Sequence, residues 1–429
     1  MGPVEPFHGV RYGPAAGDPE SLLAPPYDII DAAAAERLRS SSPYNAVHLI
    51  LPEGEGKERY ERVAARFRAW LSDGILRPDP EPAVYLHRHT FVHEGRTRQR
   101  IGLFCAVRLT PFSEGRILPH EETHSGPKED RLALTLACRA QLSAVLLLAS
   151  DPDAALYELL DRAFRAGHGV LATGAAERER HELVQVASAS LAKELCAAAG
   201  AAPLLIADGH HRYETALEVR SRLSQEPRAR KVLACVVSEA DPGLLLLPTH
   251  RSVRGSQIPG EWKQRLPSGF SVEPVPPPTR SDRAGCGRRY GETGADAAAA
   301  RAHETGSPVL FCPGEGTAWR IRAPTGEGGP PLGEERIASL LFDRRILPSL
   351  LGCDVAEAVR RGVLSYHRDP AGASRAAGRQ GLVGLLPAPK IWEVRHLAGR
   401  GRRLPPKTTY FTPKVPSGLV YRSLSRSFP

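Results

Sequence analysis

The segment LLIADGHHRYETAL, residues 204–217, constrains the fold more than any other part of the chain. The apolar run at 203–207 predicts a buried strand, and a helical pattern over 211–223 follows it almost at once. Gly209 separates the two elements and permits another group to approach the backbone closely. Because the first N–H groups of a helix have no partner within it, the segment predicts an anion site at a strand–turn–helix junction.

Four side chains at this turn suit that chemistry. His210, His211 and Arg212 can each meet a phosphate, and only the arginine is certain to be charged at neutral pH. Asp208 can cap the helix or bind a hydroxyl or a metal ion. The alternative is a capped helix with surface histidines, which is harder to reconcile with two adjacent histidines between an aspartate and an arginine.

A second polar cluster covers residues 118–131 and holds two histidines, three glutamates, an aspartate, a lysine and an arginine. His120 and Glu121 are the preferred pair for general acid–base work. Lys128 and Arg131 are candidates for binding phosphate. The alternative is a solvated surface loop, and the segment alone does not decide between the two.

A third candidate lies near the C-terminus, where four prolines stiffen residues 405–420. Its lysines and threonines suit a cradle for an oxyanion, and the candidates are Lys407, Thr408, Thr409 and Lys414. The alternative is a strand that docks through Tyr410 and Phe411. Weaker candidates are Asp28, Asn45 and the run Thr249-His250-Arg251.

Familiar nucleotide and hydrolase motifs are missing from the sequence. There is no GxxxxGK[ST] loop, no GxGxxG after a strand and no GxSxG, so the usual ATPase, dinucleotide-binding and α/β-hydrolase interpretations lose their main support.

The rest of the chain alternates strands with helices, which predicts a mixed α/β or α+β architecture. A hairpin is expected from strands at 83–93 and 100–109, and a helix at 57–71. Further expected elements are a helix at 31–39 with Asp31 as its N-cap, a strand at 45–51, helices at 131–139, 154–165, 176–199 and 336–351, and strands at 144–148, 232–237 and 381–386.

At 429 residues, the chain is long enough for two or three cores. We expect a main α/β region at 1–254 and a linker or poorly ordered insertion, rich in Pro, Gly and Arg, at 255–302. A C-terminal α/β region at 303–429 would return the tail at 405–420 to the site.

Composition narrows the functional class. No apolar run reaches 18 residues and residues 1–14 lack the features of a signal peptide, so we expect a cytoplasmic protein without a membrane partner. Seven scattered cysteines without a CxxC pair argue against a disulfide framework or a structural zinc. The net charge of +9 comes mostly from dispersed arginines, which fits coding bias better than a nucleic-acid partner.

Taken together, these segments resemble a widespread bacterial and archaeal family known as a conserved domain of unknown function. The resemblance spans nearly the whole chain, is thinnest around 276–289, and rests on five segments in order: Pro26-Tyr27-Asp28, Asn45 with 49–52, His120-Glu121 to Arg131, Asp208 to Thr215, and 406–411 with Pro413-Lys414.

A more distant similarity links the Asp208-Gly209-His210-His211-Arg212 segment to free-serine kinases of the ParB/sulfiredoxin superfamily. It implies an α+β fold with a ParB/sulfiredoxin-like nucleotide-binding core and an additional α/β domain. Gly209 and Arg212 match phosphate-binding positions, and either His210 or His211 matches the histidine. The sulfiredoxin cysteine is missing, so sulfinate chemistry is not implied.

The resemblance and the residues together predict a phosphotransferase that acts on a small hydroxyl compound such as L-serine. The donor would be ATP, ADP or pyrophosphate, with Mg²⁺ held by Asp208 or Glu121 and the proton taken by Glu121 or Asp28. Substrate contacts are expected from Asn45, Thr249, His250, Arg251 and Tyr410. The alternatives are a ParB-like module that binds a nucleotide without turnover, and a phosphomonoester hydrolase.

Overall fold

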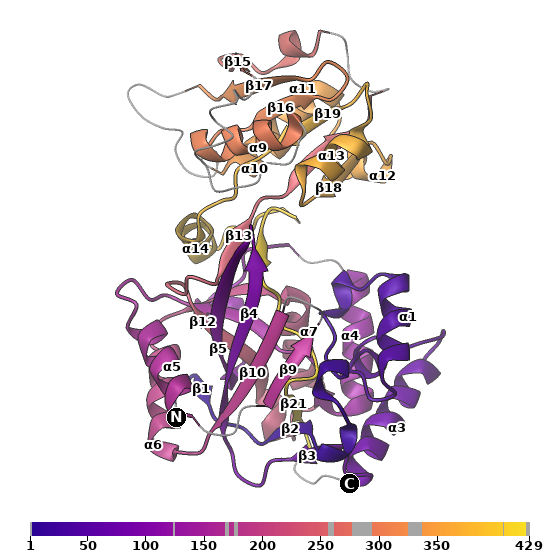
Figure 1. Cartoon of the computed structure of the whole chain (residues 1–429), viewed down its shortest axis with the longest axis vertical. Coiled ribbons are helices and arrows are strands. Elements are labelled where there is room, and N and C mark those ends of the chain that lie inside the picture. Colours follow the sequence, from indigo (N-terminus) through magenta and orange to yellow (C-terminus); the bar gives the residue numbers. More distant parts are fainter. Residues whose placement is uncertain are drawn as a thin grey trace. The chain divides into compact units, whose positions relative to one another are not determined.

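The computed structural model describes residues 2–122, 125–167, 171–175, 179–255, 261–276, 294–324, 337–405 and 407–425. The chain forms two compact units: the first comprises Met1–Leu245 and Pro413–Pro429, and the second comprises Leu246–Thr412 (Figure 1). The sequence placed a boundary at 254 instead. Each unit has its own hydrophobic core, and the mixed α+β class is confirmed.

The first unit is built on a mixed sheet whose strands, among the described residues, run in the order β6-β11-β8-β12-β5-β4-β10-β9, with β1 paired to β5. The β11–β6 and β12–β8 pairs are parallel and the others antiparallel. The bounds are β1 Val4–Glu5, β4 Val84–His93, β5 Arg96–Arg108, β6 Ile117–Leu118, β8 Val145–Ala149, β9 Leu171–Ala175, β10 Glu179–Val186, β11 Leu204–Asp208 and β12 Lys231–Ser238.

The expected hairpin is confirmed as β4 and β5. Glu94 and Gly95 form its two-residue turn, both with positive φ (51° and 74°), as the tight turn of a hairpin requires. The second strand starts at Arg96, four residues earlier than expected.

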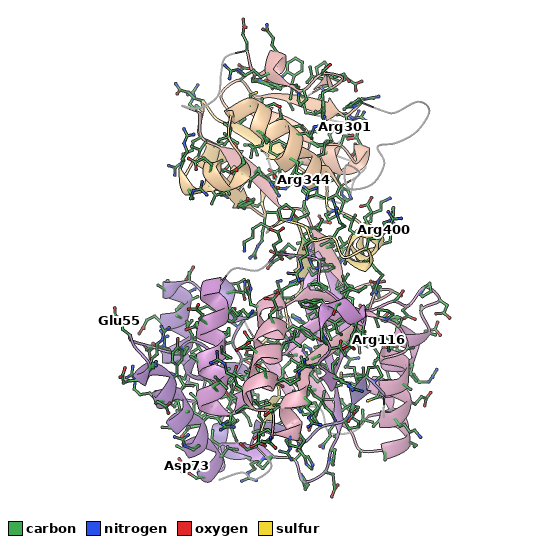
Figure 2. The ribbon with its side chains drawn as sticks, turned by 180° about the vertical axis from the view of Figure 1, so that it is seen from behind. Glu55, Asp73, Arg116, Arg301, Arg344 and Arg400 are labelled. Atoms are coloured by element: carbon green, nitrogen blue, oxygen red, sulfur yellow. The ribbon has the colours of Figure 1, made fainter. Side chains whose placement is uncertain are left out.

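Helices α5 and α6 lie on one side of this sheet (Figure 1), whereas α7 contacts β8 and β12, α4 packs on α7, and α3 packs on α4. Their bounds are α1 Ala32–Ser41, α2 Val47–Ile50, α3 Glu58–Ser72, α4 Ser125–Cys138, α5 Ala155–Ala166, α6 Ala189–Ala199 and α7 His210–Arg222. Asp31 caps α1, as expected, by accepting from the Ala34 N–H at 2.7 Å. Glu55 and Asp73, which flank α3, are exposed and point outward (Figure 2).

Helix α3 shows why periodic segments are predictable. Tyr60, Val63, Ala64, Phe67 and Trp70 recur at helical spacing and are all buried. They pack with Tyr421 of β21 (Tyr421–Ser423). That strand belongs to a small sheet in the order β3-β2-β21-β7, with β2 Gly9–Tyr12, β3 Leu76–Pro78 and β7 Ala140–Gln141. The C-terminal segment is thereby built into the first unit.

One sequence prediction in this unit is wrong and two are right only in part. The strand expected at 45–51 is the helical turn α2, because the Asn45 side chain accepts from the Val47 N–H at 2.9 Å and starts a turn. The helix expected at 131–139 begins at Ser125, so it takes up half of the expected polar loop. The helix expected at 176–199 is strand β10 followed by α6, which Ser188 caps; residues 176–178 lie outside the described part.

The second unit holds a sheet in the order β15-β17-β16-β19-β14-β18 among the described residues. The strands are β14 His250–Val253, β15 Ser271–Val275, β16 Val309–Cys312, β17 Thr317–Arg322, β18 Leu364–His367 and β19 Leu382–Leu385, and the pair β13 Leu245–Leu247 with β20 Tyr410–Thr412 stands apart. The helices are α9 Gly294–Thr305, α10 Ala338–Leu341, α11 Leu347–Leu351, α12 Val355–Arg360, α13 Pro370–Ala377 and α14 Ile391–Gly399.

Two sequence predictions concern residues of this unit. The helix expected at 336–351 consists of α10 and α11 joined by a π-helical segment, Phe342–Ile346. The stretch expected to be a linker, 255–302, contains β15 and most of α9 within its described part, whereas 256–260 and 277–293 lie outside it. Among the described residues, none of the helices has the length and apolar character needed to cross a bilayer.

Candidate functional site

The strand–turn–helix unit expected at 204–217 is present, and its turn is tightly built. Strand β11 ends at Asp208, Gly209 has φ +91°, and α7 begins at His210. A Cβ atom on Gly209 would come within 2.9 Å of the Arg212 Nε atom. The Arg212 side chain therefore folds back across the start of its own helix, and this packing requires glycine at position 209.

Two cationic side chains meet at the Asp208 carboxylate. Arg212 donates to its Oδ2 atom and Lys414 donates to its Oδ1 atom, while Arg212 also donates to the Ala144 carbonyl. All three side chains are about nine-tenths buried, with exposures of 10% for Asp208, 9% for Arg212 and 13% for Lys414. Burial alone would raise the pKa of Asp208, but Lys414 and Arg212 outweigh it and hold that pKa well below its usual range.

His120 and His210 join the second polar cluster to this turn. The His120 backbone N–H donates to His210 Nε2 at 3.2 Å, and the two rings lie edge to face at 4.6 Å between centroids. Because an N–H can only donate, His210 Nε2 carries no proton, and the ring is neutral. Burial lowers the pKa of His120 to about 4 and that of His210 well below its ordinary value. Neither histidine offers a positive charge at pH 7.

A small pocket of about 50 Å³ lies beside Arg212. Arg131 of α4 and Tyr27 also line it, and the Arg131 guanidinium stacks over the Tyr27 ring at 4.1 Å. Arg131 donates to the Ile50 carbonyl at 2.7 Å and also binds its neighbour Asp130. Pockets for whole drug-sized ligands measure roughly 300–1,000 Å³, so this one has room only for a small group.

Helix α4 packs against α7 next to the pocket. Lys128 lies 3.6 Å from the Glu214 carboxylate, and Thr215 donates to the Lys128 carbonyl at 3.5 Å. Lys128 is partly exposed (39%), so its ion pair with Glu214 is open to solvent.

The other candidates of the first unit differ in exposure. Glu121 is half-buried next to His120, and His211 is half-buried on α7. Asp28 is exposed within a short 3-10 turn, Tyr27–Ile29. Asn45 is buried, and its amide donates to the Ser21 and Leu23 carbonyls at 2.7 and 3.0 Å, so its side chain holds the backbone of its own neighbourhood. Thr123 and His124 of the same polar cluster lie outside the described residues.

The candidates Thr249, His250 and Arg251 lie in the second unit, on or next to β14. Arg251 is fully buried and makes a bidentate ion pair with Asp343, at 3.0 and 2.6 Å, and it also donates to the Thr249 carbonyl at 2.6 Å. His250 Nδ1 accepts from the Leu386 N–H at 3.2 Å. These contacts account for both side chains within the core of that unit.

The segment at 405–412 also belongs to the second unit, whereas Lys414 belongs to the first. Thr408 is buried and donates to the Pro405 carbonyl at 2.8 Å. Lys407 is exposed with φ +63°, and Thr409 is half-buried. The Tyr410 ring packs under the Arg368 guanidinium at 3.9 Å, and Pro406 lies outside the described residues.

Sequence reasoning missed one cation, Arg100 of β5. It is fully buried and donates to the Pro413 carbonyl, directly before Lys414, and its Nε and Nη2 atoms have no hydrogen-bond partner. Burial lowers its pKa, partly offset by carboxylates that include Asp208. The alternating pattern of a strand does not show whether a given arginine faces solvent or a buried site. The sequence alone therefore did not single out Arg100.

Comparison with solved structures finds several matches at low identity. A variant of a free serine kinase in complex with ADP aligns with a TM-score of 0.37 and 15% identity over 72% of this chain and 87% of that chain. A conserved hypothetical protein from Pyrococcus furiosus aligns with a TM-score of 0.36 and 16% identity over 73% and 93%. SbnI from Staphylococcus aureus, truncated at its C-terminus, aligns at 0.35 and 14% over 71% and 82%.

None of the curated proteins matches this sequence. The model of the DUF1015 family, described as proteins of unknown function, matches residues 4–327. The chain therefore belongs to the DUF1015 family.

Proposed function

We propose that the turn at Asp208 to Arg212 binds a phosphate group of a nucleotide or of pyrophosphate, and that the protein transfers a phosphoryl group to a small hydroxyl acceptor such as L-serine. The observation that carries the proposal is the pairing of Arg212 and Lys414 on one buried carboxylate at the start of α7. Two cations held beside the first turn of a helix, where the helix dipole favours negative charge, are an arrangement suited to a polyanion.

Each part of the site has a role in this proposal. Asp208 positions the two cations, since it fixes both ammonium and guanidinium groups in place before a ligand arrives. Arg131, which shares the pocket with Arg212, and the partly exposed Lys128 extend the positive surface. Phosphoryl transfer needs mainly this kind of positioning and charge neutralisation.

The expected magnesium ion fits Asp208 poorly. Oxygen ligands suit Mg²⁺, but each of the two Asp208 oxygens already accepts from a cation. No step proposed here depends on a metal ion at this turn.

The proposed step is an in-line displacement. The acceptor hydroxyl oxygen attacks the terminal phosphorus of the donor, and the bond between that phosphorus and its bridging oxygen breaks. The hydroxyl proton passes to a carboxylate, for which we propose Glu121, because its neighbour His120 donates to His210 at the turn. Asp28 is the second choice because it is exposed.

The test is a product assay with the full chain. Purified protein is incubated with L-serine, Mg²⁺ and ATP, ADP or pyrophosphate, and O-phosphoserine is measured by phosphorus NMR. Formation of phosphoserine with one donor is expected, and Arg212→Ala is expected to lower the rate about 100-fold or more, as loss of one charge-stabilising donor does in other enzymes. The matched control is Arg222→Ala, on the same helix but half-exposed, which should leave the rate within about twofold.

Two outcomes contradict the transferase, and a third contradicts the site assigned to it. Nucleotide binding without any product would favour the binding module. Release of inorganic phosphate from a phosphomonoester, without phosphoserine, would favour the hydrolase. A rate that Arg212→Ala leaves unchanged would remove the site itself.

A further inference from the structure

Three histidines and a glutamate gather on one face of the sheet, on the neighbouring strands β4 and β10. His87 and His89 lie two residues apart on β4, and Glu179 and His181 lie two residues apart on β10, so each pair shares a face. The antiparallel register places His181 directly opposite His89. The cluster shares no residue with the turn at Asp208, and nothing in the proposed function uses it.

The candidate ligand atoms of His89, Glu179 and His181 all lie within 4.8 Å of one another. His89 Nε2 is 3.4 Å and His181 Nε2 is 4.0 Å from Glu179 Oε2. Ligand atoms around a tetrahedral zinc, with bonds of about 2.0–2.1 Å, stand roughly 3.3 Å apart, so small side-chain movements bring all three into range.

Burying these polar rings without hydrogen-bond partners costs free energy, which argues against a purely structural role. His87, His89 and His181 are at most 2% exposed, and buried polar atoms normally have partners. Neither ring nitrogen of His89 has a hydrogen-bond partner, and neither does His87 Nδ1. An ion shared between His89 Nε2 and the Glu179 carboxylate, 3.4 Å away, would supply the partner that this buried nitrogen lacks.

Hydrogen bonding prepares one ring for a ligand. His87 Nε2 lies 3.0 Å from His181 Nδ1, which leaves His181 Nε2 directed toward Glu179. A group that accepts from the far nitrogen of a ligating ring fixes its tautomer, a part that a carboxylate or carbonyl commonly takes and that His87 takes here. The half-exposed Glu179 (49%) provides a way in from the surface.

The positive charge of Arg100 disfavours a metal cation at this cluster. Arg100 of β5 is paired in register with His89, and it lowers the pKa of His89 and His181 together with burial, which is the larger cause. The Glu179 carboxylate offsets this charge, and neutral imidazoles are the form that binds metal.

We propose that His89, His181 and Glu179 form a binding site for one divalent transition-metal ion, with Zn²⁺ as the representative. Two imidazoles and one carboxylate favour such ions over Mg²⁺ or Ca²⁺, which prefer oxygen ligands, and three protein ligands leave a coordination position open.

The test uses the full chain after treatment with a chelator and dialysis. Calorimetric titration with Zn²⁺ should give one ion per chain, and Co²⁺ should give the intense visible bands of a four-coordinate site. Glu179→Gln is the main variant because its half-exposed side chain is not needed for packing, and it should weaken Zn²⁺ binding at least tenfold. His93→Gln, on the same strand beyond the cluster, is the matched control and should bind as the unchanged protein does.

A thermal readout guards against misfolded variants. Zn²⁺ should raise the Tm of the unchanged chain and of His93→Gln, but not that of Glu179→Gln, since an ion stabilises only the state that binds it. Absence of stoichiometric binding by the unchanged chain would overturn the proposal. Equal affinity in Glu179→Gln would also overturn it, because the ion would then bind elsewhere.

Discussion

At the scale of single residues, the site depends on Gly209 as much as on the charged groups. Its φ of +91° disfavours any side chain, and the Arg212 guanidinium occupies the space that a Cβ would need. The residue therefore links backbone geometry to the position of a cation.

Gly209→Ala should lower the free energy of unfolding by about 1–2 kcal/mol, because of the strained φ and the contact with Arg212. It should also weaken ADP binding, since the guanidinium must move away from Asp208. Gly115→Ala is the matched control, because its φ is +66° but no atom lies within 4 Å of the added Cβ. It should lower the free energy of unfolding through backbone strain only and leave ADP binding unchanged. Urea denaturation and ADP titration measure the two effects. An unchanged ADP affinity in Gly209→Ala would contradict the role given to this packing.

Single residues also show where sequence reasoning was sufficient. Asp208, Gly209, His210 and Arg212 were singled out because a strand ends and a helix begins there, and they lie together with His120 and Lys414 as described above. Arg251 also follows the end of an expected strand in the sequence and was a candidate for the same reason. In the structure it forms a bidentate ion pair with the buried Asp343, which lies 92 positions away. No local pattern reveals such a partner.

At the scale of elements, α7 is tied to the chain after β6 through the His120–His210 pair. Both rings are buried and neutral, so protonating either one in the folded state is costly. In the unfolded chain both would take up a proton below about pH 6.5. The unfolded state therefore binds more protons, and stability falls as the pH falls.

Between pH 7 and pH 5, the His120 shift alone should lower the free energy of unfolding by about 2 kcal/mol, given its pKa of about 4. Urea denaturation at a series of pH values, with a chelator present, measures the loss. His120→Gln should reduce the loss by about that amount without abolishing it, because His210 and other buried histidines still contribute, whereas His93→Gln should leave the loss unchanged. A stability that stays constant or rises from pH 7 to pH 5 would contradict the buried, neutral pair.

Elements with clear periodicity were predictable, and elements decided by tertiary contacts were not. The pattern of α3 and the turn at Glu94-Gly95 were sufficient for the helix and the hairpin. The run at 45–51 alternates like a strand, yet the Asn45 side chain accepts from the Val47 N–H and starts a helical turn there. Residues 179–186 fall within the helix expected at 176–199, whereas seven residues of β10 pair with β4, a partner distant in the sequence.

At the scale of the whole molecule, the chain crosses between its two units near residues 245 and 412. The candidate residues are divided by these crossings: Lys414 is in the first unit with Asp208, and Lys407 to Tyr410 are in the second. The sequence placed them in one segment of 16 residues and could not show this division, because a unit boundary depends on which core each residue joins.

The central claim is that Lys414 and Arg212, held by Asp208, bind a phosphate group of the ligand. Calorimetric titration of ADP into the unchanged chain, Lys414→Met and Lys193→Met tests it most directly, since Lys193 is an exposed lysine of α6 in the same unit. ADP should bind the unchanged chain and Lys193→Met equally, and Lys414→Met at least tenfold more weakly. Equal affinity in all three proteins, or no binding of ADP, ATP or pyrophosphate to the unchanged chain, would contradict the account.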